Sequence, residues 1–137
     1  MQKEHVSYFW ERNPAIAGVL LAVPTIAVHA ALPGRLAAAG AALLLVSVAA
    51  VYLGLAFADG SPKRIAIEMV GVALYGSAAL FGLAGPVWVI PAALALHPAW
   101  DGMHHPRALG GAPIWFPTAC AVFDLLVAAW IAWRLSI

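Results

Sequence analysis

The chain has 137 residues, of which 64% are hydrophobic and only 9% are charged, whereas a soluble domain carries about 25% charged residues. A chain this short cannot hide so much apolar surface from water, because small domains leave a large fraction of their area exposed, and we therefore predict an integral membrane protein. A formal net charge of +1, without a basic stripe, argues against a nucleic-acid partner.

Five apolar segments are long enough to cross about 30 Å of hydrocarbon as helices of roughly 20 residues each. Turn sequences rich in Gly and Pro, such as "LPGR" and "DGSPKR", separate these segments. We predict an all-α membrane protein, a five-transmembrane-helix bundle that forms a single polytopic membrane domain over residues 1–137. The expected spans are 14–32, 36–58, 65–85, 86–105 and 117–135.

The residues before the first span resemble a short helix lying in the membrane interface. Val6, Phe9 and Trp10 recur at i, i+3 and i+4 and would share one apolar face. Small residues before Ala31 are spaced like a signal-peptidase site, but Pro24 interrupts the apolar core, so we expect the first span to stay uncleaved.

The basic side chains predict the orientation of the bundle. With five spans, the N-terminus and the loops at 59–64 and 106–116 share one side of the membrane, and only Arg35 and Arg134 lie on the other. The positive-inside rule then places the N-terminus in the cytoplasm and the C-terminus outside, in a bacterial inner (plasma) membrane. The basic residues on the cytoplasmic side are Lys3, Arg12, Lys63, Arg64 and Arg107.

Ionisable residues inside the predicted spans are the main functional signal, because each costs several kcal/mol in lipid. His29 lies near the outer end of the first span and is expected to form a hydrogen bond between helices. The other intramembrane ionisable residues are Glu68, His97, Asp101, His104, His105 and Asp124.

The fourth predicted span carries a stripe of candidate metal ligands. His97, Asp101 and His104 stand at i, i+4 and i+7, so on a regular helix they project from one face, with His105 beside them. Imidazole and carboxylate groups on one stripe are suitable ligands for zinc or iron. Pro98 could instead bend or break this helix next to His97.

Three acidic residues are expected at a similar depth below the cytoplasmic face. At about 1.5 Å per residue, Glu68, Asp101 and Asp124 would lie roughly 6, 7 and 10 Å inside their span boundaries. Because they belong to three different spans, we predict that they converge on one site. Tyr75, two turns beyond Glu68, is expected to pack there or to donate a hydrogen bond.

These patterns predict a divalent transition metal, zinc or iron, bound in the cytoplasmic half of the membrane. The expected ligands are His97, Asp101, His104, His105 and Glu68. Glu68 and Asp124 are the candidate catalytic groups, acting as a general base or orienting a histidine. A metal-activated water could hydrolyse an ester or amide, and iron could oxidise a lipid or isoprenoid chain.

The segment "DGMHH" at 101–105 resembles the histidine boxes of fatty-acid hydroxylases and desaturases, with Asp101 where their "HxxHH" motif has its first histidine. Alkaline-ceramidase-like hydrolases are a second family of similar membrane metalloenzymes, with a histidine-bound zinc. Desaturases have several such boxes, and this chain has too few histidines for a full set. The resemblance implies a metal-dependent hydrolase or oxidoreductase that takes a lipophilic small-molecule substrate from the bilayer.

Other interpretations of the same residues remain open. The His, Asp and Glu groups could form the relay of a proton- or cation-coupled transporter or channel subunit. If the fourth span ended near Leu96, "DGMHHP" would be an ordinary loop, but 11 residues are too few to cross the membrane. Spans rich in small residues also predict a homo-oligomer, and a purely structural subunit is a further alternative.

Overall fold

The computed structural model describes residues 9–104 and 112–137, and over these residues it contains helices and no strands. His105 and the part of the predicted interfacial helix up to residue 8, including Val6, lie outside the described residues. A helical turn at 9–12 precedes the first long helix. The long helices are α2 (Pro14–Ala31), α3 (Gly34–Asp59), α4 (Pro62–Ala84), α5 (Val89–Met103) and α6 (Phe116–Ser136).

Proline and glycine set the helix boundaries. Pro14 and Pro62 occupy the first turns of α2 and α4, where a missing backbone N–H costs nothing. Gly60 ends α3 in the left-handed conformation with φ 67°, which a residue with a side chain rarely adopts. The next residue, Ser61, caps α4 by accepting a hydrogen bond from the Arg64 N–H.

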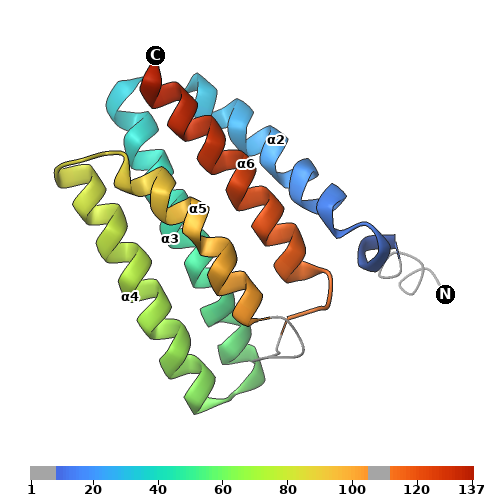
Figure 1. The fold of residues 1–137 in the computed structure, drawn as a ribbon. Helices are drawn as coiled ribbons and strands as arrows, with labels where there is room; N and C mark the ends of the chain where they lie inside the picture. Colours follow the sequence, from blue (N-terminus) through green and yellow to red (C-terminus); the bar gives the residue numbers. More distant parts are fainter. Residues whose placement is uncertain (1–8, 105–111) are drawn as a thin grey trace.

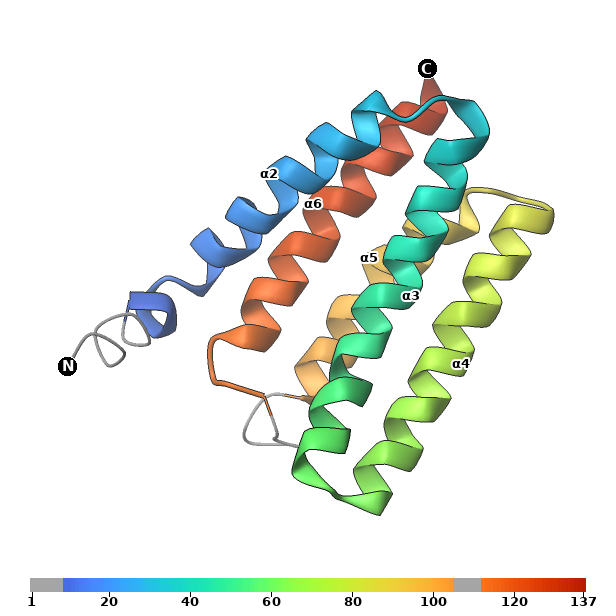
Figure 2. The same cartoon turned by 180° about the vertical axis from the view of Figure 1, so that it is seen from behind.

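The five helices run alternately up and down one bundle, so that α2 begins at one end and α6 finishes at the other (Figure 1). α3 packs mainly on α4, α5 on α6, and α6 on α2, while α5 also contacts α3 and α4. Seen from behind, α2 and α3 meet at the turn that joins them and diverge below it (Figure 2). These two consecutive helices therefore share little contact.

Four of the described helices, α2, α3, α4 and α6, are long and apolar enough to cross a membrane. α5 has 15 residues, which corresponds to about 22 Å and is less than the thickness of the hydrocarbon. The helical span predicted at 86–105 was too long, because the residues before Val89 form a turn and the helix ends at Met103. Four membrane-spanning helices thus follow from length and composition.

Small residues allow the helices to approach closely. The buried residues of α3 are mostly alanines, including Ala41, Ala42 and Ala49. In α2, a Cβ added to Gly18 would lie 2.5 Å from the Ala119 carbonyl oxygen and 2.8 Å from the Val122 Cβ of α6. The α2–α6 contact therefore requires glycine at position 18.

We predict that Gly18→Ala destabilises the protein by about 1–3 kcal/mol, because the added methyl group meets backbone that cannot rotate away. The change is measurable as a lower unfolding midpoint in detergent micelles. Gly76→Ala in α4 is the matched control, since nothing lies within 4 Å of its added Cβ and alanine favours the helix by about 1 kcal/mol. Equal losses in the two variants would contradict the close contact.

Candidate functional site

A cluster of three buried side chains joins α5 to α6. The Nδ1 atom of His97 lies 2.7 Å from Asp124 Oδ2 and 3.5 Å from Asp101 Oδ1. One potential ligand atom of each side chain lies within 4.8 Å of the others. All three side chains are at most 1% exposed. The arrangement can hold a proton or a metal ion between one imidazole and two carboxylates.

The cluster contains buried polar atoms without a hydrogen-bond partner among the described residues. They are His97 Nε2, Asp101 Oδ2 and Asp124 Oδ1. Buried polar atoms are normally satisfied, because an unsatisfied one costs about 1–3 kcal/mol. Two carboxylate oxygens of one cluster without donors therefore point to a bound cation, a proton or a water in this cluster.

A second buried pair, from α4 and the end of α5, lies beside this cluster. His104 Nε2 is 2.5 Å from Glu68 Oε1, and His104 Nδ1 is 2.8 Å from the carbonyl oxygen of Trp100. The indole N–H of Trp100 donates to the other Glu68 oxygen at 3.2 Å. Both ring nitrogens of His104 are thus occupied, and the structure places His104 and Glu68 against each other and apart from the His97 cluster.

Tyr52 of α3 connects the pair to the cluster. Its hydroxyl donates to Asp101 Oδ1 at 2.8 Å, and its ring stacks on His104 with centroids 4.0 Å apart. Tyr52 is 1% exposed, so this contact is shielded from the surroundings. The two groups therefore form one connected set of side chains from α3, α4, α5 and α6. Its members are Glu68, His104, Tyr52, Asp101, His97 and Asp124.

The connected set carries more potential negative than positive charge. Its three carboxylates belong to Glu68, Asp101 and Asp124, and its two imidazoles to His97 and His104; each of these side chains is at most 1% exposed. Even with both imidazoles protonated, one carboxylate charge would remain without a partner in the set. An isolated buried charge is costly, so an additional proton or a metal cation must compensate it.

The local sequence explains how α5 positions its share of the site. The helix continues through Pro98, so His97 and Asp101 lie one turn apart on the same face. It ends at Met103, and His104 leaves the helical path as the C-cap, its N–H bonded to the Asp101 carbonyl. The His97 imidazole and the Asp101 carboxylate thus lie on one helical turn, while the His104 side chain turns toward Glu68 of α4.

Gly71 allows α4 and α5 to approach at the Glu68 pair. A Cβ at this position would lie 2.6 Å from the Trp100 indole. Without a side chain at position 71, the indole reaches across α4 and hydrogen-bonds Glu68, one turn earlier. The glycine therefore supports the site, although it carries no polar group.

His29 lies outside this site, toward the other end of the bundle. Its Nε2 atom donates to the Ala37 carbonyl oxygen at 3.1 Å, and its Nδ1 accepts from the indole N–H of Trp130 at 3.1 Å. An indole N–H only donates and a carbonyl oxygen only accepts, so these partners select the neutral ring. The predicted role of His29 in hydrogen bonding between helices is confirmed.

Tyr52 and Trp100 belong to the site, although the sequence pattern did not identify them. Tyr52 is the one ring with a hydroxyl in the long apolar run of α3, and Trp100 stands within a span instead of at its end. A buried polar ring needs a hydrogen-bond partner in lipid, and that requirement was the available signal. Tyr75 packs edge-on against His97, with ring centroids 4.8 Å apart, in keeping with its predicted packing role.

The chain belongs to the family DUF6010, described as a family of unknown function, whose model matches residues 13–135. This range contains α2 to α5 and nearly all of α6, and with them the His97 cluster, the Glu68–His104 pair and Tyr52. No curated protein and no solved structure matches the chain. The chemistry of the site is therefore argued from its own residues.

We predict that Glu68 and His104 are energetically coupled. His104→Ala leaves a buried carboxylate without its main partner and should cost about 3–5 kcal/mol. Adding Glu68→Gln replaces that carboxylate by a neutral amide, and the double variant should recover part of the loss. Unfolding midpoints of the single and double variants in detergent give the coupling energy, and strictly additive effects would show that the two side chains do not interact.

Proposed function

We propose that the protein is a membrane-embedded metal-binding protein whose site is formed by His97, Asp101 and Asp124. The observation that carries the proposal is the convergence of two carboxylates and an imidazole from α5 and α6, with carboxylate oxygens left unpaired. A divalent cation would compensate the excess of negative charge in the connected set. It would also give the unpaired carboxylate oxygens a bonding partner.

The spacing of the three side chains is compatible with a small divalent metal. For metal–ligand bonds of about 2.0–2.2 Å, neighbouring ligand atoms lie roughly 3 Å apart. The separations from His97 Nδ1, 2.7 Å to Asp124 and 3.5 Å to Asp101, bracket this value. A nitrogen and two oxygen ligands suit zinc or iron better than calcium, which prefers a larger set of oxygens.

We further propose that the metal serves a hydrolase or oxidoreductase reaction on a lipophilic substrate from the bilayer. A metal ion there would supply Lewis acidity next to groups that can exchange protons. Glu68 and His104 are placed for that task, because they are hydrogen-bonded to each other and connected to Asp101 through Tyr52. Asp124 would share the metal with His97 Nδ1, from which it lies 2.7 Å away.

The metal proposal predicts the elemental content of the purified protein. Wild-type protein supplied with zinc or iron should carry the metal, and His97→Gln or Asp124→Asn should lose most of it. Glu68→Gln is the matched control, because it neutralises a carboxylate of the connected set outside the three-residue cluster, and it should retain the metal.

The unfolding midpoint is a second measurement, which distinguishes the loss of a metal ligand from misfolding of the variant. A ligand of the folded state raises the unfolding midpoint, so added metal should stabilise the wild type and Glu68→Gln but not Asp124→Asn. Wild-type protein that neither retains metal nor is stabilised by it would overturn the proposal. Equal metal content in all variants would do the same.

A proton- or cation-conducting subunit is the second candidate, and one specific observation favours it. From Glu68 through His104, Tyr52, Asp101 and His97 to Asp124, each side chain is hydrogen-bonded to the next, stacked on it or within 3.5 Å of it. Chains of acids and histidines within a membrane are typical of proton relays. Metal-free wild-type protein that conducts protons in vesicles would favour this function.

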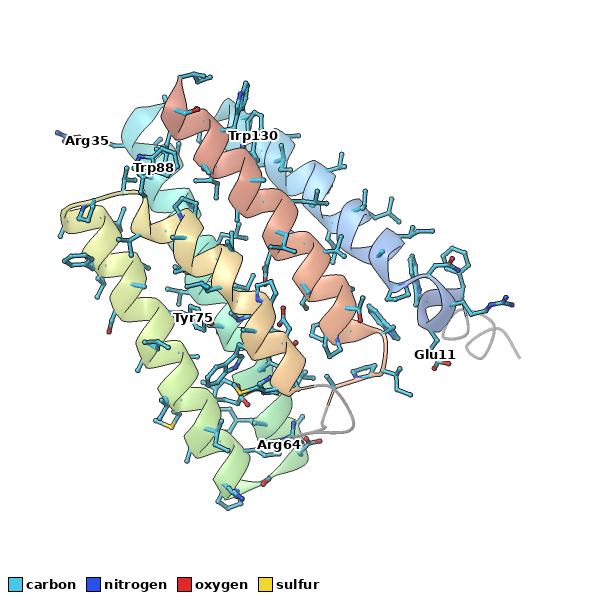
Figure 3. The ribbon with its side chains drawn as sticks, in the orientation of Figure 1. Glu11, Arg35, Arg64, Tyr75, Trp88 and Trp130 are labelled. Carbon is cyan, nitrogen blue, oxygen red and sulfur yellow. The ribbon has the colours of Figure 1, made fainter. Side chains whose placement is uncertain are left out.

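We also propose that α5 crosses the bilayer as the fourth of five spans, with the N-terminal side cytoplasmic and the C-terminus outside. α5 runs along the bundle between the ends that α4 and α6 connect (Figure 1), and the turn before Val89 lengthens its path. Arg64 and Glu11 lie at one end of the bundle, and Arg35 and the indoles of Trp88 and Trp130 at the other (Figure 3).

The five-span topology predicts an extracytoplasmic signal from a reporter enzyme fused after Ile137. A reporter inserted at Gly60, between α3 and α4, should read out in the cytoplasm and serves as the control, because two crossings precede it. A cytoplasmic signal at both positions would mean that α5 enters the membrane without crossing it.

A further inference from the structure

The diverging helices α2 and α3 enclose a crevice of about 500 Å³ that opens sideways from the bundle. Its walls are mostly apolar, with Val28 and Leu32 on one side and Leu43 and Leu44 on the other. Binding sites for small molecules commonly measure about 300–1,000 Å³. The crevice is therefore large enough to take part of a lipid chain.

The polar groups of the crevice walls are satisfied within their own helices. The Thr25 hydroxyl donates to the Leu21 carbonyl oxygen, and the Ser47 hydroxyl donates to the Leu43 carbonyl oxygen, both at 2.8 Å. His29, at the base of the crevice, is bonded to Ala37 and Trp130. The walls thus offer no unsatisfied donor, which suits a hydrocarbon chain.

A guanidinium group lies behind His29 and Leu32 of the crevice wall, where it lines the adjoining cavity between α3, α5 and α6. Arg134, in the last turn of α6, donates to the carbonyl oxygens of His29 and Leu32, both of which line the crevice. A guanidinium has five N–H donors in a planar fork, and Arg134 also contacts His29 Nδ1 at 3.4 Å, so these three contacts still leave donors for a further acceptor. An anion that reached this position would meet a partly buried, fixed cation.

Among the described residues, no acidic side chain lies at the end of the bundle that carries Arg134. Glu11 precedes α2 and Asp59 ends α3, both at the opposite end. The acids within α4, α5 and α6 lie in the half of each helix nearest that same opposite end, whereas Arg134 stands in the last turn of α6. The cationic end therefore complements an anion from outside the chain.

We infer that this crevice is a binding site for an anionic phospholipid of the bilayer, with an acyl chain between α2 and α3 and the phosphate at Arg134. Phosphate and guanidinium form charge-assisted, often bidentate hydrogen bonds. The indoles of Trp88 and Trp130 lie at the same end of the bundle as Arg35 (Figure 3), and indoles favour the headgroup level of a membrane. A lipid phosphate is the anion found at that level.

A second copy of the chain is a poorer occupant of the crevice. Two copies in one membrane share the same orientation, so a symmetric dimer through this face would bring the Arg134 end of each copy to the same level. Such an arrangement opposes like charges without an acidic side chain between them. The bilayer, in contrast, supplies both the hydrocarbon and the negative charge.

The site is separate from the proposed metal centre. Arg134 lies ten positions beyond Asp124 in α6, about 15 Å along the helix. None of the residues that line the crevice belongs to the His97 cluster or to the Glu68–His104 pair. Lipid binding at α2 and α3 can therefore be present or absent whatever the metal content of the protein.

The test uses full-length protein in nanodiscs of phosphatidylglycerol and phosphatidylcholine in equal amounts, followed by native mass spectrometry of the released protein. We expect the wild type to retain phosphatidylglycerol several-fold over phosphatidylcholine. Ser47→Trp fills the crevice and should remove this preference, and so should Arg134→Gln. Added phosphatidylglycerol should also raise the unfolding midpoint of the wild type more than phosphatidylcholine does.

Two matched controls separate the site from general effects. Ser77→Trp places the same bulk on an exposed position of α4 outside the crevice, and Arg35→Gln removes a cation that projects away from the bundle at the same end (Figure 3). Both should keep the preference. Equal retention of the two lipids by the wild type would overturn the inference, as would equal effects of the two tryptophan variants, or a protein dimer that Ser47→Trp dissociates.

Discussion

Hydrocarbon offers no hydrogen-bond partner, so the buried polar groups of helices that cross a membrane depend on partners held within the protein. The hydrogen bond between His97 and Asp124 shows the consequence most directly. It ties α5 to α6 at the position where both helices carry ionisable side chains, and it can form only if the two helices face each other in this register. The contacts of Asp101 and Tyr52 then depend on the same register.

Two buried histidines, His29 and His104, form similar hydrogen bonds toward opposite ends of the bundle. His29 and His104 are each bonded to a backbone carbonyl, and each lies beside a tryptophan within the bundle. The second partner differs, since His29 Nδ1 meets the indole of Trp130 and the guanidinium of Arg134, whereas His104 meets the carboxylate of Glu68. A carboxylate beside an imidazole can exchange a proton with it, so the proposed proton-transfer role falls on His104, whereas His29 links α2 to α3 and α6.

Much of the fold and part of the site were predictable from the sequence. Apolar length located α2, α3, α4 and α6, and the similar depth of Glu68, Asp101 and Asp124 anticipated side chains that the structure connects. The end of α5 was not predictable from periodicity, because the contacts of His104 are to Glu68 and Tyr52, which belong to other helices. Tyr52 itself lies 49 positions from Asp101, a separation for which helix periodicity provides no signal.

The proposed metal would satisfy more atoms of the His97 cluster than a single shared proton does. A proton between His97 Nδ1 and Asp124 Oδ2 accounts for the 2.7 Å contact, but it satisfies only those two atoms. Asp101 Oδ2 and Asp124 Oδ1 would still lack donors, and Tyr52 already gives its only proton to Asp101 Oδ1. A divalent ion accepts several ligands at once and carries the charge that two adjacent carboxylates require. The proposed metal would therefore satisfy these oxygens with one occupant, whereas protonation would need a second proton shared between the two carboxylates.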